Sequence, residues 1–165
     1  MGGLIVAAIV ITVLAVLAYS SLRVVKQSER LVIFRLGRAD PRFVKSPGLA
    51  IVIPIIDRGV AVDMRERRYE ISVANAPTSD DGAMSADLTI RCRVVDPFRC
   101  VINVVDLDVA MRGVTATSFQ KVAAESPRGR FVGNSGALAA ALEAKLSEVT
   151  EHWGVSLTNV EVRGA

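Results

Sequence analysis

The sequence contains few of the residues that catalysis and metal binding usually require. Of its 165 residues one is histidine and two are cysteine, so a histidine-based triad or a cysteine–histidine metal site has almost no candidates. His152 stands at the end of a predicted helix, where a capping or surface role is expected. Cys92 and Cys100 fit no disulfide framework or metal motif and are expected to be buried. These shortages favour a structural or binding role, and no catalytic residue, metal or cofactor is predicted.

Two other groups of residues, one acidic and one rich in glycine, are not predicted to form a binding or catalytic site. Asp80 and Asp81 stand in a turn-rich segment, where solvated carboxylates are the default. Gly129, Gly133 and Gly136 lack both the spacing and the Lys-Ser/Thr ending of a phosphate loop. A hydrolase that uses a serine–lysine pair stays an open alternative, although no serine is singled out by its neighbours.

Long apolar runs are also scarce, and only one of them could enter a bilayer. From Leu4 to Ala18 only Thr12 interrupts the apolar residues, and no charged residue occurs before Arg23. Because about 20 helical residues cross the hydrocarbon core of a bilayer, the sequence predicts a transmembrane anchor over residues 1–22.

A cleaved signal peptide and a lipid anchor are the alternatives for this segment. Signal peptides begin with a basic stretch, which residues 1–3 lack, and their apolar core is shorter. A small-residue cleavage site over residues 16–18 keeps a cleaved, secreted domain open. Myristoylation of Gly2 expects Ser or Thr at position 6, where this sequence has Val6. An uncleaved anchor is therefore favoured.

Positive charge is concentrated directly after the anchor. Residues 23–45 contain seven basic side chains and two acidic ones, whereas the sequence from Ser46 onward has a net charge of −2. This distribution fits attraction to anionic lipid headgroups, which acts over about one Debye length. Nucleic acid is disfavoured, because the basic residues are not interleaved with stacking aromatics. The same basic bias predicts a single-pass cell-membrane protein whose C-terminal domain lies in the cytoplasm.

The residues expected to contact the membrane come from the anchor, from the basic segment after it and from a short apolar run over residues 48–56. They are Leu4, Ile5, Val10, Leu14, Leu17, Tyr19, Arg23, Lys26, Leu49, Ile51, Ile53 and Pro54.

The part after the anchor begins with segments rich in β-forming residues. Strands are predicted over residues 28–36, 59–63, 68–73 and 84–95. The last is the clearest, because alternate residues there are apolar and share one face: Leu88, Ile90, Cys92 and Val94.

The connections between these strands are less regular. Residues 37–47 are predicted to form a loop or hairpin connection, and residues 75–83 a turn-rich loop. Residues 48–56 are wholly apolar and contain Pro54, which predicts an edge strand, a bulge or a segment that dips into the membrane surface. Burial is the favoured interpretation of this run.

Two helices and a final strand complete the sequence. A helix capped by Asp106 or Asp108 is predicted to end at Ser126-Pro127, with one face formed by Leu107, Met111, Val114, Ser118 and Val122. A second helix over residues 135–152 is predicted from one apolar stripe, formed by Leu138, Leu142, Leu146, Val149 and Trp153, with Gly154 as C-cap. Residues 155–162 form a last strand. The order predicts an α+β domain, a mainly antiparallel sheet with helices on one face.

The ordered residues resemble the stomatin/prohibitin/flotillin domain, called SPFH or band 7. The similar stretches are Val24–Arg38, Ser46–Leu49 with Ile53–Asp57, Arg91–Pro97, and Trp153–Val155 with Val160–Val162. They occur in the family's order, and the nearest subgroup is the stomatin-like (slipin) proteins of prokaryotes. The resemblance implies a transmembrane anchor over residues 1–22, a basic juxtamembrane segment with the first strand over residues 23–47, and an SPFH domain over residues 24–165.

The resemblance also implies a function. Such proteins are non-enzymatic membrane scaffolds that form large homo-oligomers, organise lipid microdomains and modulate membrane proteins. Their partners include membrane proteases, channels and, in prokaryotes, small NfeD-type membrane proteins. Relatives usually continue into a long Ala/Glu-rich coiled coil, whereas this sequence stops at Ala165, so truncation and reduced ring formation both stay open. A regulator of a membrane-bound protease without a scaffold role is the main alternative.

Overall fold

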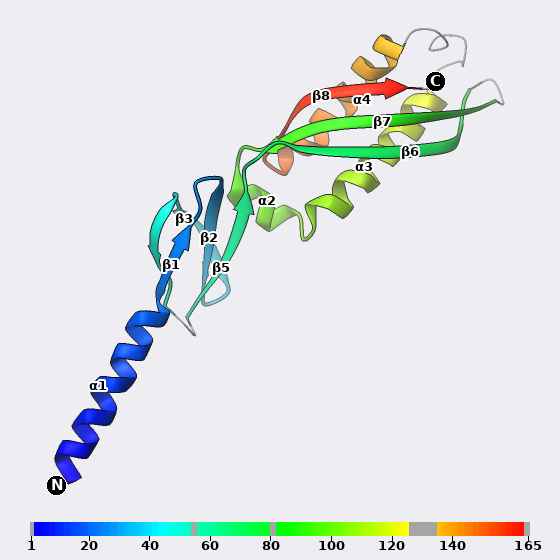
Figure 1. Ribbon diagram of the computed structural model, residues 1–165. Helices are drawn as coiled ribbons and strands as arrows, with labels where there is room; N and C mark the ends of the chain where they lie inside the picture. Colours follow the sequence, from blue (N-terminus) through cyan, green and yellow to red (C-terminus); the bar gives the residue numbers. More distant parts are fainter. Residues whose placement is uncertain (1, 54–55, 80–81, 126–134, 164–165) are drawn as a thin grey trace. The chain divides into compact units, whose positions relative to one another are not determined.

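A computed structural model describes residues 2–53, 56–79, 82–125 and 135–163 of the chain. Its contacts divide the chain into two compact units, an N-terminal unit over residues 1–64 and a C-terminal unit over residues 65–165. Helices and antiparallel strands occur together, which confirms the predicted α+β class (Figure 1).

The N-terminal unit begins with the helix α1, Gly2–Ser20. The predicted anchor extended to Leu22, but Leu22 is already the first residue of a strand. Within the residues that the structure describes, no helix is both long and apolar enough to cross a membrane. Of the membrane-spanning helix predicted over residues 1–22, the structure therefore confirms that a helix forms, over Gly2–Ser20, but not that it spans a membrane.

Two small antiparallel sheets follow α1. The first is a ribbon of β1 (Leu22–Val25) and β4 (Gly48–Ile51), in which Leu22 lies opposite Ile51 and Val24 opposite Leu49. The second has the order β3-β2-β5 and is formed by β2 (Glu29–Arg35), β3 (Arg38–Lys45) and β5 (Asp57–Asp63). The ribbon was not predicted at β1, because its short apolar sequence continues directly from the helix.

Strand β3 decides between the loop and the hairpin connection predicted over residues 37–47, in favour of the hairpin. Arg35 pairs with Arg38, so only Leu36 and Gly37 connect β2 to β3. Both have positive φ, 52° and 77°, which is the type I′ geometry of a two-residue hairpin. Pro41 is tolerated because β3 is an edge strand whose register with β2 shifts between Val32 and Phe34.

The apolar run 48–56 is an edge strand at its start, as predicted, but most of it is not buried. Only Ala50 and Val52 of its described residues are buried; they join a small core with Val25, Leu31, Ile33 and the partly buried Phe43. The side chains of Leu49 and Ile51 are exposed, because successive residues of a strand face opposite sides and no described residue of this unit covers the outer side.

The C-terminal unit contains a sheet of order β6-β7-β8, formed by β6 (Arg67–Pro77), β7 (Ala83–Val94) and β8 (Val155–Arg163). Burial alternates along β7, and the predicted face of Leu88, Ile90, Cys92 and Val94 is buried. The predicted loop over residues 75–83 is shorter than expected, because β6 continues past an irregularity at Asn75, which has a φ of 56°.

Among its described residues this unit also contains the helices α2 (Pro97–Asn103), α3 (Leu107–Ala124) and α4 (Ser135–His152). Helix α2 was not predicted, since Asp96-Pro97 was interpreted as a strand end. The Asp96 side chain instead accepts from the amides of Phe98 and Arg99 and caps the helix, with Pro97 in its first turn. Asp106 caps α3, which decides between the two predicted caps.

The core of the C-terminal unit lies between the sheet and two of its helices. Helix α3 packs along β6 and α4 along β8, while the other face of β7 stays exposed, so the helices cover one face as predicted (Figure 1). The predicted stripe of α4 is buried at Leu138, Leu142 and Leu146. Phe119 of α3 is also fully buried, although it lies outside the predicted face.

Candidate functional site

The outer face of the β1–β4 ribbon is an exposed apolar surface. Leu22 and Ile51 form one cross-strand pair and Val24 and Leu49 the next, and all four side chains point to the same side. Val24 is 80% exposed, Leu49 70% and Ile51 65%. We call these four residues the ribbon face. Contiguous exposed apolar side chains of this kind mark a surface that meets a partner or a membrane.

The ribbon face begins directly where α1 ends. The amide of Val52, one residue after β4, donates to the carbonyl oxygen of Ser21 at 2.8 Å. Helix α1 has no charged residue, and Ile5, Val10 and Tyr19 on it are exposed. The apolar surface of the helix thus continues into the apolar surface of the ribbon.

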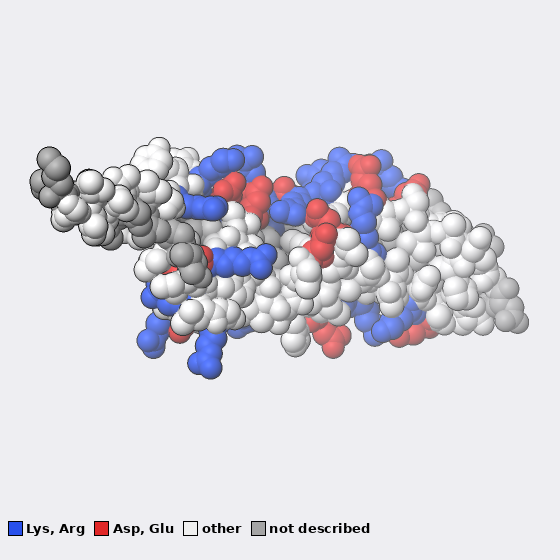
Figure 2. Space-filling model, turned by 90° about the horizontal axis from the view of Figure 1, so that it is seen from below, with Lys and Arg blue, Asp and Glu red and all other residues white. Residues whose placement is uncertain are grey.

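Basic side chains begin at the same place. Figure 2 shows α1 free of Lys and Arg, with the first of them where the helix ends. Arg23, Lys26, Arg38 and Arg42 are exposed, and Lys26 forms an ion pair with Glu29 at 3.7 Å. The structure therefore places apolar and basic surfaces next to each other in the N-terminal unit.

One ion pair in this unit joins an exposed arginine to a buried carboxylate. The Arg35 guanidinium donates to both carboxylate oxygens of Asp57, Nε to Oδ1 at 2.8 Å and Nη2 to Oδ2 at 3.1 Å. The Asp57 carboxylate is fully buried and also accepts from the amide of Ile53. The Arg35 hydrogen bonds hold the pKa of Asp57 below its ordinary value, against the effect of burial, and the pKa of Arg35 is raised in return.

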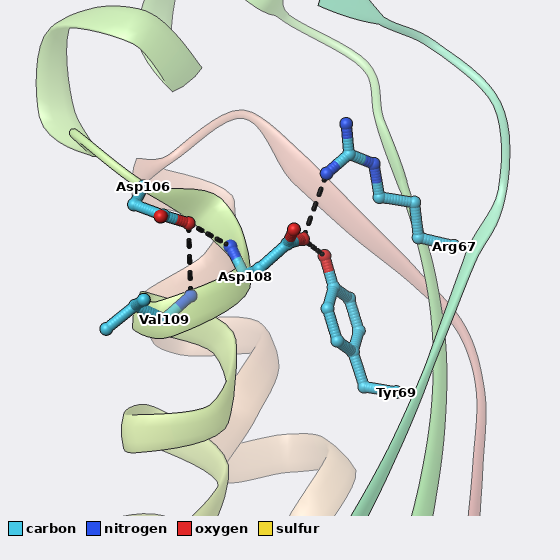
Figure 3. Close-up of polar contacts among 5 residues, drawn as sticks. All are labelled: Arg67, Tyr69, Asp106, Asp108 and Val109. Atoms are coloured by element: carbon cyan, nitrogen blue, oxygen red, sulfur yellow. Dashed lines mark hydrogen bonds and ion pairs between the residues drawn. The ribbon is translucent and has the colours of Figure 1, made fainter.

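The C-terminal unit has a polar cluster of a different kind, at the start of α3 (Figure 3). Asp108 Oδ1 accepts from Tyr69 Oη at 2.7 Å and from Arg67 Nη1 at 2.9 Å. These hydrogen bonds lower the pKa of Asp108, while burial and the bond to Asp108 raise the pKa of Tyr69. Asp106, two residues earlier, accepts from the amides of Asp108 and Val109. The cluster connects strand β6 to helix α3, and the Asp108 carboxylate already has its hydrogen-bond donors within the unit.

The remaining polar residues singled out in the sequence are less organised. Cys92 and Cys100 are free and buried, as predicted, and burial raises the pKa of Cys92 to about 11. His152 is exposed at the end of α4, with Nδ1 2.9 Å from the Glu148 carbonyl oxygen. Asp80 and Asp81 lie outside the described residues. The described part of the chain shows no group of three or more residues able to hold a metal ion.

The predicted membrane-contact residues fall into three sets. Ile5, Val10, Tyr19, Leu49, Ile51 and Ile53 are exposed apolar or aromatic residues, and Arg23 and Lys26 are exposed basic ones. The side chains of Leu4, Leu14 and Leu17, and Pro54 as a whole, lie outside the described residues. Sequence reasoning missed Val24 and placed Leu22 in the anchor, because the alternation that exposes them on one face is visible only once β1 is known to pair with β4.

The chain is similar to known proteins over nearly all of its length. Residues 23–164 match the SPFH domain / Band 7 family. A stomatin homologue of Pyrococcus horikoshii is 29% identical over 158 residues, which are 96% of this chain and 59% of that protein. Stomatin of Mus musculus is 28% identical over 142 residues, 86% of this chain and 50% of that protein.

An uncharacterized protein of Methanothermobacter thermautotrophicus is 32% identical over 155 residues, 94% of this chain and 48% of that protein. The chain therefore spans about half, or slightly more, of the length of the curated relatives that it matches.

Proposed function

Because the chain belongs to the SPFH domain / Band 7 family, we propose that it is a membrane-attached, non-catalytic scaffold. In this proposal α1 enters the bilayer, the N-terminal unit rests on the bilayer surface, and copies of the chain associate laterally. The observation that carries it is the ribbon face, an exposed apolar surface that continues directly from an uncharged helix.

The distribution of charge supports a bilayer as the partner of this surface. Residues 23–45 carry a net charge of +5, and each basic residue near an anionic leaflet contributes about 1 kcal/mol. Apolar contact and headgroup attraction then both act on the N-terminal unit. Neither of them needs a catalytic group or a cofactor.

We propose further that the chain crosses the bilayer once, at α1, with residues 23–165 in the cytoplasm. The basic residues follow the helix, and basic flanks favour the cytoplasmic side. Attachment confines the copies to two dimensions, which raises their effective concentration and favours homo-oligomers. A membrane protease, a channel or an NfeD-type protein is the class of client that such an assembly would recruit or restrain.

Attachment is tested by flotation of the full chain with lipid vesicles, followed by extraction with alkaline carbonate. The chain is expected to float and to resist extraction. Val10→Lys places a charge in the middle of α1, which costs about 2.5–3.5 kcal/mol in a bilayer, and should release the chain. Val105→Lys, with the same charge change at an exposed site in the C-terminal unit, should float normally. A wild-type chain that stays in the aqueous fraction would overturn the proposal.

The scaffold role is tested separately, by the mass of the particle extracted in mild detergent. An assembly much heavier than one chain supports scaffolding, whereas a monomer argues against it. A stoichiometric complex with a protease and without homo-oligomers would support the protease-regulator alternative. Labelling by a serine-directed probe, lost when one serine is changed, would instead support the serine–lysine hydrolase.

A further inference from the structure

The tip of the β2–β3 hairpin has an unfavourable residue for its turn. The type I′ geometry at Leu36 and Gly37 favours Asn-Gly, because most L side chains strain the backbone at positive φ whereas Asn tolerates it. The first position here is leucine, and its side chain is 79% exposed. Leu36 thus combines backbone strain with an exposed apolar side chain, and neither stabilises the fold. Such a combination is expected where a residue serves a function other than folding.

Leu36 is next to a second exposed apolar residue. Its amide donates to the carbonyl oxygen of Ile56 at 2.9 Å, so the hairpin tip lies next to Ile56, the residue before β5. The Ile56 side chain is also exposed. A hollow of about 440 Å³ adjoins them, with Phe34, Leu36, Ile56, Val60 and Arg58 among its lining residues. We call Leu36 and Ile56 the tip edge.

The Arg35–Asp57 ion pair lies directly beside the tip edge. Arg35 and Asp57 are paired at the end of the β2–β5 ladder, and the next residues outward are Leu36 and Ile56. The Arg35 guanidinium also lies over the ring of Phe43, 4.9 Å from its centroid. Arg35 is therefore engaged within the unit, and its effect on any partner must come through the residues that it positions.

The tip edge lies at the end of the unit where α1 leaves. Val52 is hydrogen-bonded to Ser21, directly after α1, and its neighbour Ile53 donates to the Asp57 carboxylate. The ion pair is thus connected to the end of the helix by two consecutive residues. Arg38 and Arg58, which flank the tip edge in sequence, are exposed.

We propose that Leu36 and Ile56 form a second lipid contact, placed at the boundary between headgroups and acyl chains of an anionic bilayer. The Arg35–Asp57 pair is a positioning pair for this contact, and Arg38 and Arg58 meet the headgroup phosphates. This inference rests on the proposed function, because it requires α1 to bring the N-terminal unit to a bilayer.

Tryptophan fluorescence in vesicles tests the contact in the full chain. Trp153 is the only tryptophan, so Trp153→Phe provides a silent background. Leu36→Trp in this background, reconstituted in phosphatidylcholine–phosphatidylglycerol vesicles, should be quenched by lipids brominated at the top of the acyl chains. Gln27→Trp is the matched control, because Gln27 is exposed just before the other end of β2. Quenching at position 36 should be several-fold stronger than at position 27.

The positioning pair is tested by adding Asp57→Asn to the Leu36→Trp chain. Removal of a negative charge alone would draw the unit toward anionic lipid and strengthen the quenching. Loss of the positioning pair should weaken the quenching, so the two explanations predict opposite changes in quenching. Circular dichroism of each variant reports whether the fold is retained; if Asp57→Asn unfolds the unit, the comparison of positions 36 and 27 still decides the contact.

The outcomes separate this inference from the proposed function. A chain that does not float with vesicles contradicts both. A chain that floats, but is quenched equally at positions 36 and 27, retains the proposed attachment and overturns the second contact. Stronger quenching in the Asp57→Asn chain overturns the positioning role of the Arg35–Asp57 pair.

Discussion

The two units use their apolar residues in different ways. The C-terminal unit buries many of its large apolar side chains between one sheet and two helices, with Phe119, Leu88 and Ile90 almost inaccessible, although Val95, Ile102, Val105 and Val109 are exposed. The N-terminal unit has a small core around Leu31 and Ile33 and leaves the ribbon face and the tip edge exposed. The N-terminal unit thus combines a small apolar core with exposed apolar residues that do not belong to that core.

The carboxylates of the two units show the same contrast. Asp57 is buried and pairs with Arg35, whereas the Asp108 side chain is 60% exposed and joins a helix end to a strand. Both have a lowered pKa because arginine or tyrosine donates to them. The comparison indicates that the lowered pKa of each carboxylate reflects a structural role. Any effect of Asp57 on the proposed lipid contact would act through the neighbouring residues Leu36 and Ile56.

The largest expected effect is on the core of the C-terminal unit. Phe119→Ala removes a fully buried side chain, and substitutions of this type cost about 3–5 kcal/mol of unfolding free energy. Leu49→Ala, on the ribbon face, should change the unfolding free energy by less than about 0.5 kcal/mol. Denaturant unfolding of both variants tests the contrast, and a large loss of stability in Leu49→Ala would show that the ribbon face is part of a core.

Acid should affect the N-terminal unit through Asp57. Its folded pKa lies below the ordinary value of 3.8, so its contribution to stability is present above about pH 5 and is lost as the pH falls through the folded pKa. The thermal midpoint of unfolding should therefore fall below pH 4, and Asp57→Asn should make the N-terminal transition less dependent on pH. Asp108→Asn is the control, since it should alter the acid response of the C-terminal unit only. An unchanged acid response in Asp57→Asn would contradict this assignment.

A smaller effect is expected at the start of α3. Asp106→Ala leaves the amides of Asp108 and Val109 without their acceptor, and loss of such a cap costs about 1–2 kcal/mol. Glu151→Ala, in the last turn of α4, removes a carboxylate that caps nothing and should be near neutral. Thermal unfolding distinguishes the two variants, and an equal loss would refute a specific capping effect.

Much of the C-terminal unit was predictable because its signals are long and periodic. The bounds of α4 and the buried stripe of Leu138, Leu142 and Leu146 follow from spacing alone, and so does the alternation of β7. Helix α2 was missed because seven residues give no periodic signal and Asp96-Pro97 is typical of both a strand end and a helix start.

The N-terminal unit was predicted less well because its elements are short and its sheets depend on pairing across the sequence. The apolar run that includes Leu49 and Ile51 was expected to be buried, yet which side of a strand is covered depends on its partners, and β1 covers only an edge. The tip edge was missed for a related reason. Leu36 looks like an ordinary strand residue, and its left-handed backbone becomes apparent only from the pairing of Arg35 with Arg38.

The smallest expected effect is a gain in stability, and it concerns Leu36 at the tip of the β2–β3 hairpin. Leu36→Asn places a residue that tolerates positive φ at the first position of the turn, so it should stabilise the N-terminal unit by up to about 1 kcal/mol. Thermal unfolding of the full chain in detergent measures this, with Leu22→Asn as a control at an exposed strand position where positive φ is not required. If the leucine was retained for lipid contact, the more stable Leu36→Asn chain should be less protected from trypsin after Arg38 in anionic vesicles. Equal protection at higher stability would mean that the strained leucine has no role at the bilayer.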